Sequence, residues 1–316
     1  MRVWEFAAAI TLSSFAVASV AMSLAVGRLG PIAARRLQRY SAASRARLLF
    51  RLRMLPAVTA LAIAFGLALP IFIVYEPPDT GETLARTLVV MAAAGAAVML
   101  RAVVRALGAW RATARVRRTW QARGRRLDGL GTSLPLFAID EPFPTVAVVG
   151  VRRPVLFVSE RVLRECTDGE VRAMLRHEAA HVTVRDNLKR FVLRACPDVV
   201  RPGGALDRAW SHAAEEAADA AAAAERPLAA VDLAGALIRV ARLAPARTPA
   251  LASAFYLGGS IESRVRNLLG SATAPAAPMA FARVLPIVAA AGFAVLAVAA
   301  APGLHQLMEI LVSRLP

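Results

Sequence analysis

The chain has 316 residues, 57% of them hydrophobic, and a mean hydropathy of +0.52. Soluble globular domains are usually about 45–50% apolar, so this composition excludes an ordinary soluble domain and favours membrane spans. The formal net charge of +17 excludes an acidic protein and leaves two partners to weigh, nucleic acid and the anionic surface of a membrane.

Three apolar stretches early in the chain are long enough to cross roughly 30 Å of hydrocarbon as helices. They cover about residues 6–27, 54–75 and 84–107. We interpret the first as a retained span and not as a cleaved signal peptide, because Glu5 offsets Arg2 and the apolar run is long. The lipid bilayer is therefore an expected partner of residues 1–107.

Two blocks of arginine account for the whole net charge. Residues 28–53 contain eight arginines, residues 101–126 contain nine, and neither block contains an acidic residue. Because both blocks flank apolar spans, we interpret them as cytoplasmic ends of those spans and expect no direct contact with nucleic acid. The pattern predicts an external N-terminus, a cytoplasmic loop at 28–53 and a cytoplasmic section from 108 to 280.

This cytoplasmic section is long enough for one compact domain. Residues 134–139, 145–149 and 154–159 are rich in β-formers and are punctuated by proline and glycine, which predicts a small sheet. Thr167 and Glu170 then match a capping box, which predicts a helix from Asp168 to near Val184. Further helices are predicted over about 187–196, 205–224, 227–243 and 260–269.

A fourth apolar stretch, at about 284–304, lies within the segment 281–316 and predicts a last span that returns the C-terminus to the outside. Cys166 and Cys196 fall in the cytoplasmic section, where we expect free, buried thiols and not a disulfide. The predicted fold is an α-helical integral membrane protein with four transmembrane helices and a mainly α (α+β) cytoplasmic domain that contains a small β-sheet.

The most specific motif of the chain is HExxH, formed by His177, Glu178 and His181. Two histidines four residues apart share one face of a helix, where both imidazoles can bind one Zn²⁺ ion. The glutamate between them is the residue type that accepts a proton from an activated water in metallopeptidases. The motif therefore predicts one zinc ion per chain, with His177 and His181 as ligands and Glu178 as the catalytic base.

A catalytic zinc site needs a third protein ligand, and the sequence offers candidates in the alanine-rich segment after residue 205. Glu215 and Asp219 form an ExxxD pattern, which predicts Glu215 as the ligand and Asp219 as a hydrogen-bond partner of a ligand histidine. Spacing alone leaves Glu216 and His212 open as alternatives to Glu215.

The run 171–182, followed by residues 185–188 and 215–219, resembles the M56 peptidase family, which contains the β-lactam-sensing receptor metalloproteases. The order of three spans, a zinc domain and a fourth span is similar too, and the M48 family of membrane peptidases, which shares both motifs, is the nearest alternative. The resemblance implies a gluzincin-type peptidase domain in the bacterial plasma membrane and a protein substrate such as a cytoplasmic transcriptional repressor. Penicillin binding is not expected, because only about a dozen residues follow the predicted fourth span.

These patterns predict a membrane-embedded zinc metalloendopeptidase that cleaves a protein or peptide at the cytoplasmic face, in regulatory proteolysis. One alternative is a quality-control protease of the M48 type, and another is a non-proteolytic membrane signal transducer with a structural zinc. The presence of Glu178 argues against the transducer, because a structural site has no use for a base.

Overall fold

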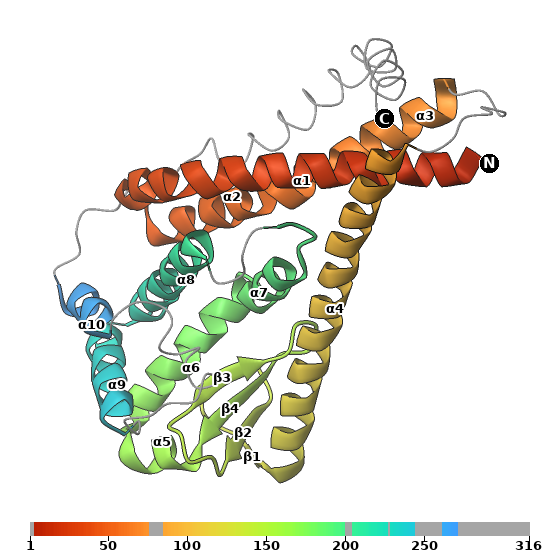
Figure 1. The fold of residues 1–316 in the computed structure, drawn as a ribbon. Helices are drawn as coiled ribbons and strands as arrows, with labels where there is room; N and C mark the ends of the chain where they lie inside the picture. The colour runs from red at the N-terminus through yellow and green to blue at the C-terminus, as the bar shows by residue number, and fades with distance from the viewer. Residues whose placement is uncertain (1–2, 76–84, 200–203, 227, 244–260, 271–316) are drawn as a thin grey trace.

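The computed structural model describes residues 3–75, 85–199, 204–226, 228–243 and 261–270, and the predicted fourth span at 284–304 lies outside them (Figure 1). Three long helical segments in the described part of the chain are apolar enough to span a membrane. The first is α1 (Val3–Arg36), the second runs through α2 (Ala42–Ile63) and α3 (Leu69–Tyr75), and the third is α4 (Arg86–Arg123). The structure therefore supports a membrane protein with at least the first three predicted spans.

Helices α1 and α2 lie side by side, and α4 crosses them steeply before it descends to the sheet (Figure 1). A π-helical turn at Ala64–Ala68 joins α2 to α3. Gly95 of α4 allows the close approach of α1, because a Cβ atom there would collide with the carbonyl oxygen of Leu12. Small residues thus let these helices pack tightly.

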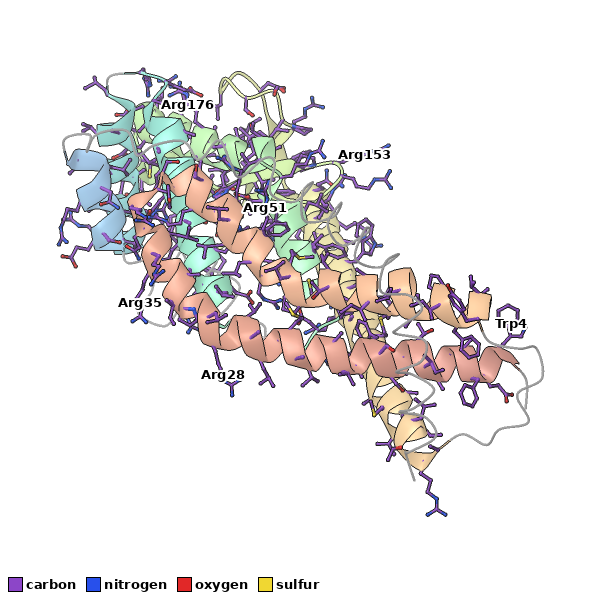
Figure 2. The ribbon with its side chains drawn as sticks, turned by 90° about the horizontal axis from the view of Figure 1, so that it is seen from above. Trp4, Arg28, Arg35, Arg51, Arg153 and Arg176 are labelled. Atoms are coloured by element: carbon purple, nitrogen blue, oxygen red, sulfur yellow. The ribbon has the colours of Figure 1, made fainter. Side chains whose placement is uncertain are left out.

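Residues 28–53, expected as a loop, are mostly helical. Helix α1 continues to Arg36, a single 3-10 turn follows at Leu37–Arg39, and α2 begins after the N-cap residue Ser41. Arginine has high helix propensity, so a block of arginines does not by itself end a helix. Arg28, Arg35 and Arg51 project from this helical hairpin, whereas Trp4 lies at the far end of α1 (Figure 2).

A four-stranded sheet follows α4, in the order β1-β2-β4-β3. Strands β2 (Leu136–Ile139), β3 (Val146–Val149) and β4 (Val155–Ser159) confirm the predicted β-rich passage, and β1 (Arg125–Leu127) is an addition. Strand β4 is central and fully buried; it pairs in parallel with β2 and antiparallel with β3. Strand β3 is consequently an edge strand, with one row of main-chain groups facing away from the sheet.

Six helices follow the sheet in the described part of the chain, and all but the first of them agree closely with the sequence prediction. They are α5 (Glu160–Glu165), α6 (Asp168–Thr183), α7 (Asp186–Ala195), α8 (Ala205–Ala223), α9 (Ala229–Leu243) and α10 (Ile261–Leu269). Helix α6 packs against the sheet, α8 and α9, and its core includes Leu156, Met174 and Leu233. Cys166 and Cys196 are free and buried, as predicted.

Helix α8 also packs against the membrane helices. Trp210 and Leu206 of α8 share a hydrophobic core with Val26 of α1 and Leu49 of α2. The same helix therefore contacts α6 on one side and the arginine-rich ends of α1 and α2 on the other.

Candidate metal centre

Helix α6 positions both histidines of the HExxH motif. It begins at the predicted capping box, in which the Thr167 hydroxyl accepts a bond from the Glu170 N–H and the Glu170 carboxylate accepts one from the Thr167 N–H. His177 and His181 follow on its buried face, where the two Nε2 atoms lie 3.2 Å apart. The helix thus presents two nitrogen donors to one point.

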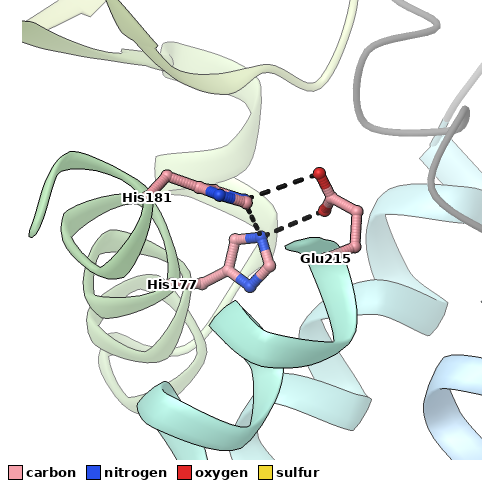
Figure 3. A group of neighbouring side chains, drawn as sticks. All are labelled: His177, His181 and Glu215. Atoms are coloured by element: carbon pink, nitrogen blue, oxygen red, sulfur yellow. Dashed lines mark hydrogen bonds and ion pairs between the residues drawn. The ribbon is translucent and has the colours of Figure 1, made fainter. Parts of the chain in front are cut away.

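Glu215 of α8 completes the group (Figure 3). Its Oε2 lies 3.3 Å from Nε2 of His177, and its Oε1 lies 3.5 Å from Nε2 of His181. All three ligand atoms lie within 4.8 Å of one another, and all three residues are buried. The structure therefore brings together the three residues that the sequence predicted as ligands.

The separation of the two imidazole nitrogens suits a tetrahedral ion. Ligand atoms about 2.0–2.2 Å from a tetrahedral zinc lie about 3.3–3.6 Å from one another, which is close to the 3.2 Å between the two Nε2 atoms. The Glu215 carboxylate places a different oxygen near each imidazole, Oε2 near His177 and Oε1 near His181. Two imidazoles and one carboxylate also form a donor set that zinc uses in catalytic sites. The three residues can hold a metal ion.

Each histidine is oriented by a second carboxylate. Nδ1 of His177 lies 2.9 Å from Oδ1 of Asp219, the residue predicted for this role. Nδ1 of His181 lies 2.8 Å from Oδ2 of Asp186, which the sequence analysis did not single out. A proton held on each Nδ1 leaves the Nε2 lone pair free for a metal ion.

A left-handed residue explains why Asp186 reaches His181. Arg185 has φ 57° and lies with Val184 between α6 and α7, so the chain leaves the path of α6 there and begins a new helix. Asp186, the first residue of α7, then lies back against the end of α6, where Lys189 also binds it at 2.8 Å. Helical periodicity does not extend across such a turn, which is why spacing did not identify this residue.

The carboxylates change the proton affinity of the site. Burial by itself lowers the pKa of His177, but Asp219 and Glu215 outweigh burial and raise that pKa to about 9. The pKa of His181 is raised by Asp186 and Glu215 against the same effect of burial. Burial favours a neutral Glu215, yet both imidazoles hold its pKa well below the ordinary value. A metal ion must therefore displace protons to bind at neutral pH.

Glu178 lies between the histidines and the sheet. Its Oε2 accepts a hydrogen bond of 3.0 Å from the main-chain N–H of Val148 in β3. The Asn187 amide, from α7, donates to the carbonyl oxygens of Val148 at 3.0 Å and Gly150 at 3.2 Å. Glu178 of α6 and Asn187 of α7 therefore hold strand β3 against these two helices.

The structure distinguishes Glu215 from the two alternatives for the third ligand, Glu216 and His212. Glu216 faces the membrane helices and forms an ion pair with Arg45 of α2. His212 is exposed. Neither lies in the group of ligand atoms.

Two arginines contact Glu215 and were not identified from the sequence. Nη2 of Arg190, on α7, lies 2.9 Å from Oε1 of Glu215, and Nη1 of Arg264, on α10, lies 3.5 Å from Oε2. No spacing rule relates residues on three separate helices, so no signal in the sequence marked these contacts.

Comparison of the sequence with models of protein families and with curated protein sequences gave no match. The resemblance to the M56 peptidases consequently rests on the motifs alone.

Proposed function

We propose that the protein is a membrane-embedded zinc metalloendopeptidase that hydrolyses peptide bonds of a protein substrate at the cytoplasmic face. The observation that carries the proposal is the convergence of His177, His181 and Glu215, with Glu178 on the same helix. Three protein ligands leave a fourth position for water or substrate, which is the arrangement of catalytic zinc sites and not of closed structural ones.

The proposed chemistry divides between the ion and Glu178. Zinc bound to the three ligands would supply Lewis acidity toward a water molecule and the scissile carbonyl. Glu178 accepts the proton of the attacking water and delivers it to the leaving amine. The Val148 N–H fixes the orientation of the Glu178 carboxylate for this transfer.

Strand β3 is the proposed binding edge for an extended peptide. Thr145 faces β4, since its carbonyl oxygen accepts the Ser159 N–H at 2.8 Å. The alternation of a strand then turns the main-chain groups of Val146 and Val148 away from the sheet. Because Glu178 and Asn187 occupy those of Val148, the N–H and C=O of Val146 are the groups that we assign to substrate pairing.

The contacts of α8 favour regulatory proteolysis over quality control. Glu215 faces the proposed metal, whereas its neighbour Glu216 binds Arg45 on the second membrane helix. A displacement of α2 would therefore move the helix that carries a metal ligand. The substrate class implied by the family resemblance, a cytoplasmic repressor, is compatible with such control.

The catalytic assignment has a direct test. Purified protein in detergent should contain about one zinc ion per chain, which Glu178→Gln should retain and His177→Ala should lose. Cells that produce the wild type should contain new protein N-termini that are absent from cells producing Glu178→Gln. A Glu178→Gln protein that still generates these N-termini would contradict the assignment.

A further inference from the structure

Arg264 is a buried arginine beside the metal centre that the proposed mechanism does not use. It lies on α10, a nine-residue helix that packs against α9 and α8. Its side chain is 2% exposed, although α10 otherwise presents charged residues such as Glu262 and Arg266 to solvent. A buried guanidinium is costly unless it is paired, so its partners indicate why it is there.

The guanidinium binds Asp219 with two parallel hydrogen bonds. Nη2 donates to Oδ1 at 2.6 Å, and Nε donates to Oδ2 at 2.7 Å. The same Oδ1 lies 2.9 Å from Nδ1 of His177. A two-point contact of this kind fixes the plane of a carboxylate, which a single bond does not. The position of Asp219 against His177 is therefore set from α10.

The third nitrogen of Arg264 faces the ligand group itself. Nη1 is buried, has no hydrogen-bond partner within the described ranges, and lies 3.5 Å from Oε2 of Glu215. One guanidinium thus lies between Asp219 and Glu215, which are one turn apart on α8. It connects Glu215, a proposed ligand, with Asp219, the carboxylate that orients His177.

The charges of the site support the same conclusion. Four buried carboxylates surround the histidines: Glu178, Asp186, Glu215 and Asp219. Among the cations that bind them, Lys189 is 22% exposed, Arg190 is 31% exposed and Arg264 is 2% exposed. Arg264 is therefore the most deeply buried of these three cations, and its charge is the least screened by solvent.

We propose that Arg264 is a positioning residue of the metal centre, which strengthens metal binding by fixing Asp219 and, through it, the imidazole of His177. Helix α10 is then a part of the metal site, although none of its residues reaches the metal. The inference rests on the proposed zinc site, but it does not depend on proteolysis.

Zinc affinity is the appropriate measurement, by competition with a chromophoric chelator at fixed pH on the full chain in detergent. Loss of a residue that orients a metal ligand typically weakens metal binding about 10–100-fold, and we expect this for Arg264→Ala. Arg264→Lys keeps the charge but not the two-point geometry, so its affinity should be intermediate. Arg266→Ala is the matched control on the same helix: it is exposed, pairs with Glu262, and should bind zinc like the wild type.

A second comparison tests whether Arg264 acts through Asp219. In an Asp219→Asn background, Arg264→Ala should cause a much smaller further loss than it does alone. The visible absorption of the Co²⁺-loaded protein should also change in Arg264→Lys and stay constant in Arg266→Ala. Losses that multiply fully in the double variant would overturn the proposal.

Two outcomes separate this inference from the proposed function. If the wild type binds no zinc, the metal centre itself is wrong and both proposals fail. If the wild type binds zinc and Arg264→Lys binds it equally tightly, only the role of Arg264 is wrong. Should Arg264→Ala fail to fold, Arg264→Lys still decides the question.

Discussion

Glu215 and Glu216 are adjacent in sequence but contact different parts of the molecule. Glu215 lies in the buried ligand group, whereas Glu216 pairs with Arg45. We therefore expect Glu215→Gln to lose bound zinc and Glu216→Gln to retain it, because only Glu215 supplies a ligand oxygen. Elemental analysis of the two purified variants measures this difference. Equal zinc loss in both would mean that the third ligand is not Glu215.

The two cysteines give a prediction that depends on pH. Burial raises the pKa of Cys166 and of Cys196 from the ordinary value of 9.0 to about 11. Because only the thiolate is nucleophilic, iodoacetamide at pH 8 should alkylate the folded protein slowly and the unfolded protein rapidly. The folded state binds the thiol protons more tightly, so this contribution to stability is present below the ordinary pKa and is lost as the pH rises through about 11.

Mass spectrometry of alkylated peptides measures these rates, with the unfolded protein as the control. Fast alkylation of either cysteine at pH 8 under native conditions would contradict the expectation that its thiol stays buried and protonated.

At the residue scale, the sequence was sufficient for motifs that lie within one element. HExxH follows helical periodicity, so His177 and His181 could be named before their helix was placed, whereas ExxxD favoured Glu215 and left Glu216 and His212 open. Asp186 and Arg264 could not, because a left-handed turn and a separate helix bring them to the site. Tertiary packing, and not spacing, determines such partners.

Strand β3 carries the substrate hypothesis, and a proline tests it at the scale of the element. Val146→Pro removes an outward-facing N–H that does not pair with β4, although it also replaces a buried core side chain, so peptide binding should weaken while the ladder to β4 is kept. Thermal unfolding of the variant is the control for the lost core contacts. We expect a reduced cleavage rate with the zinc content unchanged. Ala147→Pro is the contrasting variant, since the Ala147 N–H faces β4 and its loss should destabilise the sheet. Full activity of Val146→Pro would exclude pairing at this residue.

Element boundaries were predictable where the chain carries explicit end signals. The capping box located the first residue of α6, and proline and glycine delimited β2, β3 and β4. Strand β1 was missed because Arg125 and Arg126 have no β-forming pattern and are held by pairing with Phe137 and Ala138 of β2. The first arginine block led to a wrong prediction, because residues 28–53 were expected as a loop and are mostly helical. A run of arginines does not by itself end a helix.

At the scale of the whole molecule, a buried ion-pair cluster joins the membrane helices to the part of the chain after α4, which contains the metal centre and is called the metal domain below. Arg53 of α2 is fully buried and binds Asp198 at 2.6 Å and Asp207, on α8, at 2.8 Å. Arg53→Ala removes the cation from its buried ion pair with Asp198, a change that typically costs about 3–5 kcal/mol. We expect a loss of that size in the free energy of unfolding in mixed detergent micelles. Arg47→Ala, exposed on the same helix, is the control and should change it by less than about 0.5 kcal/mol.

If Arg53→Ala were as stable as the control, this ion-pair cluster would not hold α2 and α8 together.

The lengths of the membrane helices lead to a prediction about topology. Helix α1 has 34 residues and α4 has 38, so at 1.5 Å per residue they extend about 51 and 57 Å, well beyond a hydrocarbon core of roughly 30 Å. The excess lies at the arginine-rich ends, which reach the metal domain, while Trp4 marks the opposite end of α1 (Figure 2). Because arginine-rich flanks stay in the cytoplasm, the metal domain should be cytoplasmic and Trp4 external.

Single cysteines test this arrangement in a background that lacks Cys166 and Cys196. In intact spheroplasts, a membrane-impermeant maleimide should label Trp4→Cys, which is 73% exposed, but should label Glu262→Cys, 77% exposed on its side chain, only after lysis. Pro316→Cys, which follows the predicted fourth span, should be labelled like Trp4→Cys. Labelling of Glu262→Cys in intact spheroplasts would place the metal domain outside the cell and exclude a cytoplasmic substrate. Protection of Pro316→Cys alone would leave the metal domain cytoplasmic and remove the fourth span, because an odd number of crossings puts the C-terminus on the side opposite to Trp4.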